Sequence, residues 1–273
     1  MKKKLNIDNL EKKAQWVWSE TLKIHKLSPE TRVASSLSPI EIFVCLYYGG
    51  FINYSNKDPL WSDRDRFIVS KGHGSLSMYP ILADLGYFSI SELSKVCTSK
   101  TFLGGIPDPI IPGYETINGS LGHGVGVGTG IAIALKTQKK KNKVFVVTGD
   151  GELHEGSVWE AFMFAGQHEL CNLNVIVDNN HISMLGKTDE IVSIKNLDKI
   201  MNELGWEVLV VNKGHSIPEL INSLKKLTNS KLKKPKLLIT HTNKGNRVPG
   251  LEGQPLSHVT GIPLDKLEKL IDG

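Results

Sequence analysis

Two short polar sequences, each directly after an apolar run, constrain the fold of this chain more than any other feature. Val144–Thr148 is followed by Gly149-Asp150-Gly151, and Leu173–Val177 is followed by Asp178-Asn179-Asn180. Continuous apolar runs of this length are typical of strands buried on both faces of a parallel sheet. The segment between them, Ser157–Glu169, has helical character, as a crossover between parallel strands requires. The pattern predicts that both polar sequences lie at one carboxyl edge of the sheet, where open α/β sheets bind ligands.

The remaining elements follow the same alternation of helices and strands. The fold class predicted from them is α/β, with a parallel sheet covered by helices on both faces and one domain over residues 1–273. Capping boxes are predicted where Ser89 precedes Glu92 and where Ser216 precedes Glu219. Further strands are expected at Phe67–Val69, Glu207–Val211 and Lys236–Thr240, and further helices at 8–26, after Ser38-Pro39, in a glycine-rich segment ending near Leu135, after Ser216, and at Leu264–Ile271.

Composition excludes several other classes of protein. Of 273 residues, 40% are hydrophobic, and no apolar run approaches the length needed to span a bilayer. The net charge of +5 suits an anionic ligand but does not demand nucleic acid. The three cysteines, Cys45, Cys97 and Cys171, have neither a disulfide framework nor zinc-site spacing, which favours a reducing cytoplasm.

The residue types after the two central strands indicate a cation and a phosphate. Asp150 offers a carboxylate oxygen and Asn180 an amide oxygen, which are hard ligands suited to Mg²⁺ or Ca²⁺. Gly149 and Gly151 have no side chains, so backbone N–H groups can approach a phosphate closely. Either triplet alone reads equally well as a plain turn. Together, at this spacing, they predict a diphosphate site that contains a divalent cation.

The pairing of GDG with a later NN resembles the thiamine diphosphate fingerprint. Four further sequences, DRDRFIVSKGHGS, GSLGHGVGVGTGIAIALK, GDGELHEGSVWEA and HTNKG, resemble the N-terminal half of transketolase and occur in that family's order. The resemblance covers about residues 10–262. It implies the thiamine diphosphate-binding fold, specifically its diphosphate-binding module, and a transketolase-like transferase that moves a two-carbon unit to a sugar acceptor.

The resemblance also implies roles for individual residues. Asp150 and Asn180 would bind Mg²⁺ through their side chains, and Ile182 through its backbone carbonyl. His73 would touch the diphosphate and act in catalysis, and His258 would face the substrate with a catalytic role. Glu160 would lie near a subunit interface. The other cofactor-binding residues implied are Gly119, Ser120, Leu121, Gly149, Gly151, Glu152 and Glu155, of which Gly119 and Leu121 would line the aminopyrimidine.

Two positions depart from the family pattern. Arg32 and Ile106 each stand where the family usually has a substrate-binding histidine. Ile106 cannot form a hydrogen bond through its side chain, so a buried donor hydroxyl against it would lose about 1–3 kcal/mol. This suggests pyruvate as the donor of an acetyl unit, in place of a ketose that donates glycolaldehyde. Arg32 is suited to a carboxylate or phosphate. The alternative is that nearby residues have taken over these roles.

No sequence in this chain resembles the family's second, pyrimidine-binding domain. The resemblance therefore implies a separately encoded C-terminal subunit that carries this domain, in an α2β2 complex without nucleic acid or membrane. Two other functions stay open: a 2-oxo-acid dehydrogenase E1-type component, which shares the GDG and NN pattern, and a catalytically silent cofactor-binding module.

Overall fold

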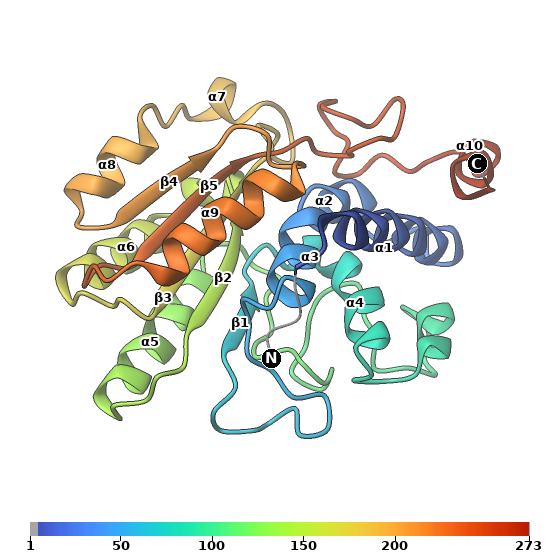
Figure 1. The fold of residues 1–273 in the computed structure, drawn as a ribbon. Helices are drawn as coiled ribbons and strands as arrows, with labels where there is room; N and C mark the ends of the chain where they lie inside the picture. The colour runs from blue at the N-terminus through green and yellow to red at the C-terminus, as the bar shows by residue number, and fades with distance from the viewer. Residues whose placement is uncertain (1–4, 273) are drawn as a thin grey trace.

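A five-stranded, wholly parallel sheet forms the centre of the molecule in the computed structural model, which describes residues 5–272 (Figure 1). The strand order is β1-β2-β3-β5-β4. Gly149 of β2 pairs with Asp178 of β3, and Asn179 pairs with His241 of β5, so the carboxyl ends of these three strands are level. The strands are β1 (Arg66–Val69), β2 (Val144–Gly149), β3 (Leu173–Asn179), β4 (Glu207–Val211) and β5 (Lys236–His241).

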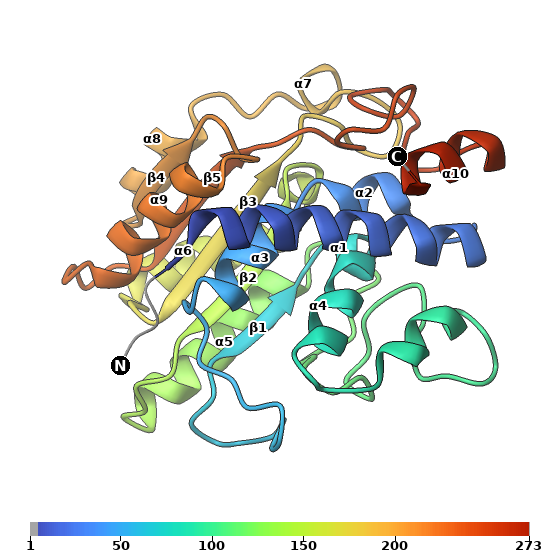
Figure 2. The same ribbon diagram turned by 45° about the vertical axis from the view of Figure 1, so that its right-hand side comes forward.

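Helices cover both faces of the sheet, as the sequence predicts. Because strand side chains alternate between faces, Val144 and Val146 enter one hydrophobic core while Phe145 and Val147 enter the other. Figures 1 and 2 show the two helical layers. The first core is covered by α5 (Gly124–Thr137), α6 (Gly156–Gln167) and α8 (Leu197–Glu203), and the second by α1 (Ile7–Leu27), α3 (Ile40–Tyr48), α4 (Met78–Asp84) and α9 (Ile217–Asn229).

The last helix, α10 (Leu264–Asp272), lies beside α1, far from it in sequence (Figure 2). Leu267 is buried in the core that contains the α1 side chains, and Lys26 pairs with Glu268 at 2.8 Å. The segment between β5 and α10 therefore crosses the carboxyl edge of the sheet. No helix among residues 5–272 is both long and apolar enough to cross a membrane.

Several element boundaries differ from those predicted. β3 continues two residues past Val177, so Asp178 and Asn179 belong to the strand and only Asn180 follows it. Pro39 is the N-cap of α3, not its first helical residue. The five-residue helix α2 (Val33–Leu37), α7 (Thr188–Ile191) and α8 were not predicted, because their sequences have little periodicity.

Of the two predicted capping boxes, one is confirmed at its N-cap and the other is wrong. The Ser216 side chain accepts from the Glu219 N–H at the start of α9. Ser89 instead accepts from Ser91 N–H at a short 3₁₀ helix, Ile90–Lys95. The Glu92 carboxylate turns away, accepting from Lys95 and Thr101. The two-residue reach of a 3₁₀ turn explains why the reciprocal bond is absent.

Candidate active site

A cavity of about 460 Å³ opens at the carboxyl edge of β1, β2 and β3. Most of the residues predicted from the sequence line it, although they come from segments far apart in the chain. The predicted residues in its wall are His73, Gly119, Leu121, Gly149, Asp150, Gly151, Glu152, Glu155, Asn180, Ile182 and His258.

Asp150 and Asn180 provide the oxygen ligands that a magnesium ion needs. Burial and the nearby Asp178 carboxylate raise the pKa of Asp150 to about 6, so its charge lacks full compensation from the protein. Asp150 Oδ2 accepts a hydrogen bond from Thr188 at 3.1 Å, which leaves lone pairs free. No group of three or more His, Cys, Asp or Glu side chains within residues 5–272 could hold a metal. A cation here would therefore be bound by one carboxylate and neutral oxygens, which suits Mg²⁺ or Ca²⁺.

Beneath these ligands, Asp178 holds a buried polar cluster together. Its carboxylate is ion-paired with Lys71, accepts from Ser38 Oγ at 2.6 Å, and accepts from the Thr242 hydroxyl. Burial alone raises the pKa of Asp178, but Lys71 and the two hydroxyls together bring it below its ordinary value. The cluster joins β1, β3, β5 and the start of α3, so it supports the floor of the cavity.

Lys244 and Lys71 both line the cavity and make it electropositive. Lys244 is 3% exposed, and its Nζ donates to the carbonyls of Ile182 at 3.2 Å and Ser183 at 2.9 Å. Burial and the positive charge of Lys71 lower the pKa of Lys244 to about 8. A diphosphate in this cavity would relieve that repulsion. The Ile182 carbonyl has a second lone pair, so it can also meet a cation.

His73 and His258 form a contacting pair in the cavity wall. Their ring centroids are 4.7 Å apart with the planes nearly perpendicular, and His258 Nδ1 is 3.0 Å from Ser35 Oγ. Burial, Lys71 and His258 lower the pKa of His73 well below its ordinary value. Burial, Lys244 and Arg32 lower that of His258 to about 4. Both rings are therefore neutral near pH 7 and able to accept or donate a hydrogen bond.

Glu152 lines the cavity, but its carboxylate is occupied by donors from the protein. One oxygen accepts from Ser70 Oγ and, at 2.8 Å, from Gly122 N, and the other accepts from Thr148 Oγ1 at 2.7 Å. Its observed contacts therefore connect β1, β2 and the 119–122 loop, a supporting position next to the predicted cofactor site.

Four predicted residues lie outside the cavity wall. Arg32 is exposed, yet its charge acts on both His73 and His258, so it lies at the rim. Ile106 is 43% exposed and packs against Gly119, where an added Cβ would lie 3.1 Å from its Cδ1. Ser120 is exposed beside them, and Glu160 is exposed on α6.

Sequence reasoning left several site residues without a role. Lys71 and Lys244 stand inside sequences that carry the family resemblance, SKGHG and HTNKG, so the signal was present without a reason to assign either lysine. Asp178 was predicted only as part of a loop triplet. The lining residues Ser35, His154 and Ser183 have no local sequence signal, because only the tertiary fold brings them to the cavity.

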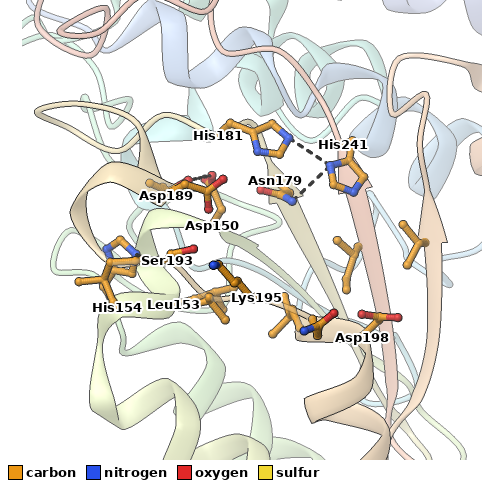
Figure 3. A pocket seen from close by; sticks show the side chains of 17 residues that line it. Asp150, Leu153, His154, Asn179, His181, Asp189, Ser193, Lys195, Asp198 and His241 are labelled. Atoms are coloured by element: carbon orange, nitrogen blue, oxygen red, sulfur yellow. Dashed lines mark hydrogen bonds between the residues drawn. The ribbon is translucent and has the colours of Figure 1, made fainter.

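A second cavity, of about 920 Å³, lies on the other side of Asp150 (Figure 3). His181 Nε2 and His241 Nδ1 are 3.1 Å apart, and the Asn179 amide lies 3.3 Å from the same His241 nitrogen. The two rings are within 14° of parallel with centroids 5.2 Å apart. That separation fits an end-to-end N–H···N hydrogen bond, in which the nitrogens face each other and not a shared metal ion.

A parallel α/β sheet with an oxygen-ligand cation site and two cavity lysines at its carboxyl edge defines a protein that binds a phosphate-bearing cofactor. Residues 34–270 match the family described as transketolase, thiamine diphosphate binding domain. The chain therefore belongs to the transketolase family.

Individual relatives agree with this assignment. The chain is 37% identical over 256 residues to one of the named subunits of apulose-4-phosphate transketolase from Actinobacillus succinogenes, covering 93% of this chain and 91% of that protein. It is 33% identical over 227 residues to 6-deoxy-6-sulfo-D-fructose transketolase subunit SqwG of a Clostridium species, covering 83% and 82%. Among solved structures, transketolase from Campylobacter jejuni superposes with a TM-score of 0.89 at 29% identity. The match covers 98% of this chain but 43% of that one.

Proposed function

We propose that this chain is the cofactor-binding subunit of a two-component transketolase that transfers a two-carbon unit from a ketose to an aldehyde acceptor. The observation that carries the proposal is the convergence of the cation ligands Asp150 and Asn180, the two lysines and the histidine pair in one cavity. The relatives named as separate subunits of apulose-4-phosphate transketolase support the same activity and the division into two chains.

Each group in the cavity has a role that follows from its chemistry. Asp150, Asn180 and the Ile182 carbonyl would hold Mg²⁺, and Lys71 and Lys244 would attract the diphosphate. Thiamine diphosphate, when bound, supplies the nucleophilic carbon and the electron sink for breaking a carbon–carbon bond beside a carbonyl. His73 and His258, neutral at pH 7, can accept or return a proton at a substrate hydroxyl.

The partner would be a subunit carrying the pyrimidine-binding domain, in an α2β2 complex. Three apolar side chains in the cavity wall support such a partner, because they are left in water: Met184 is 54% exposed, Leu185 70% and Ile191 48%. We place the complex in the cytoplasm, since Cys45, Cys97 and Cys171 are all free.

Ile106 favours a second candidate, transfer of an acetyl unit from pyruvate, because its side chain cannot meet a donor hydroxyl. Its position argues against giving that candidate first place. Ile106 lies outside the cavity wall, next to Gly119, so it does not form a closed pocket for a methyl group. The rim position of Arg32 suits an anionic group on either substrate.

The decisive experiment combines the purified chain with the subunit encoded beside it and measures product formation by mass spectrometry. With thiamine diphosphate and Mg²⁺, we expect turnover of xylulose 5-phosphate with an aldose phosphate acceptor, and none from either chain by itself. Turnover of pyruvate only would support the acetyl candidate. Reductive acylation of a lipoyl domain would indicate the 2-oxo-acid dehydrogenase class, and absence of any cofactor binding by the complex would indicate a silent module.

A further inference from the structure

A buried polar network lies behind Lys244, on the side away from the cavity. Glu41 of α3 is only 2% exposed. Its carboxylate lies 2.8 Å from His215 Nδ1 and accepts from Arg247 Nη2, also at 2.8 Å. His215 stands just before α9, and Arg247 stands three residues after Lys244. None of these residues lines the cavity.

We propose that His215, oriented by Glu41, is a positioning residue for Lys244, an inference that rests on the proposed diphosphate role of that lysine. His215 Nε2 lies 2.9 Å from the backbone N–H of Asn243, the residue directly before Lys244. A backbone N–H can only donate, so Nε2 must be the acceptor and Nδ1 must carry the ring hydrogen. That hydrogen is then donated to Glu41. The carboxylate thereby sets the tautomer that His215 needs in order to hold the loop.

The backbone on the other side of Lys244 is also held. Gly245 N–H donates to the Ala34 carbonyl of α2 at 2.9 Å. Gly245 has a φ of +72°, and an added Cβ would lie 2.9 Å from the Leu251 backbone, so a side chain is disfavoured there. Lys244 is thus suspended between two anchored amides, one on α2 and one on His215. Loss of either anchor would leave its ammonium group free to move from the cavity.

The inference separates His215 from an ordinary packing residue in a measurable way. The His215→Ala variant removes the acceptor for Asn243 N–H. His215→Gln keeps the pattern, because its amide can donate to Glu41 while its carbonyl accepts from Asn243 N–H. His168→Ala, on the exposed end of α6, is the control for loss of a histidine ring elsewhere.

The first measurement is amide hydrogen exchange of the ligand-free chain, which does not depend on the proposed activity. In His215→Ala, exchange in the 242–246 segment should rise about tenfold, as expected for loss of one hydrogen bond, while β5 stays protected. His215→Gln and His168→Ala should exchange like the wild type. Unchanged exchange in His215→Ala would overturn the anchoring role, and so would faster exchange throughout the chain.

The second measurement is a double-mutant cycle on the affinity of the two-subunit complex for thiamine diphosphate with Mg²⁺, by calorimetry. His215→Ala should weaken binding about tenfold, similar to losses of supporting ligand contacts at metal sites. In a Lys244→Met background, the same change should cost less than about twofold, because its target is gone. Additive losses would overturn the proposal. If the wild-type complex binds no cofactor, the proposed function fails, while the exchange result still decides the anchor.

Discussion

At the residue scale, the site depends on charges that the fold buries at a cost. Asp150 is 7% exposed and faces a second carboxylate, Asp178, whose own charge is already matched by Lys71. A buried carboxylate without a full partner destabilises the folded chain. Such a residue is typical of a site that is completed by a ligand, here a cation.

Asp150→Asn should therefore separate stability from function. We expect the free energy of unfolding of the ligand-free chain, measured by urea at neutral pH, to rise by about 1 kcal/mol, because a poorly matched charge is removed. Turnover by the two-subunit complex should be lost. The exposed Asp189→Asn should change the free energy of unfolding by less than about 0.5 kcal/mol. A marked destabilisation by Asp150→Asn would contradict this view of the site.

His25 in α1 predicts part of the pH dependence of stability. It is 2% exposed, and burial lowers its pKa even though Glu30 acts in the opposite direction. The Thr31 hydroxyl donates to the Ser28 carbonyl, so it accepts from His25 Nδ1–H at 2.9 Å. The ring is therefore held neutral.

Because the folded-state pKa of His25 lies below the unfolded value, its contribution is complete above the unfolded pKa and is lost as pH falls through it. Between about pH 7.5 and 5.5, the free energy of unfolding of His25→Gln should fall by about 1 kcal/mol less than that of the wild type. His168→Gln should keep the wild-type slope. Parallel curves for wild type and His25→Gln would show that His25 titrates normally.

At the element scale, α5 shows how a glycine-rich helix is built to approach the sheet. An added Cβ at Gly128 would lie 2.5 Å from Val146 Cγ2 of β2, and one at Gly124 would lie 2.4 Å from Ser70 Oγ. Gly126 and Gly130 face outward, with nothing within 4 Å of such a Cβ. The same residue type thus permits close packing on one face and lowers helix propensity on the other.

This contrast predicts opposite effects of one substitution within one helix. Gly126→Ala and Gly130→Ala should each stabilise the isolated chain by up to about 0.8 kcal/mol through helix propensity. Gly128→Ala should destabilise it by about 2 kcal/mol, because β2 cannot move away from the added methyl group without disturbing the sheet. Urea unfolding followed by circular dichroism measures all three. Equal stability of the Gly126 and Gly128 variants would mean that α5 does not pack as described.

At the scale of the whole molecule, the cavity is a meeting point of distant segments. His73 follows β1 and His258 lies in the segment after β5, yet their rings touch. The parallel sheet makes this possible, because every strand delivers its following loop to the same edge. The loops converge on a cation site, so occupation of that site should support the whole edge.

Removal of the divalent cation should test this convergence in the two-subunit complex. Dialysis against EDTA should lower its thiamine diphosphate affinity about tenfold or more, with recovery on addition of Mg²⁺ or Ca²⁺. The complex containing Asp150→Asn should show no such recovery. Cofactor affinity that is insensitive to EDTA in the wild-type complex would argue against a cation held by Asp150 and Asn180.

By itself, the sequence determined the parallel sheet, four of its strand starts to the residue, and the principal cation ligands. These features are local: an apolar run, a glycine turn and a carboxylate directly after a strand all act within a few residues. The tertiary structure alone decided the placement of β5 between β3 and β4, the pairing of Lys71 with Asp178, and the support of Lys244 by His215. It also placed Arg32 and Ile106 at the rim. Those outcomes depend on contacts between residues far apart in the chain, which have no local periodicity and arise only when two buried faces pack against one sheet.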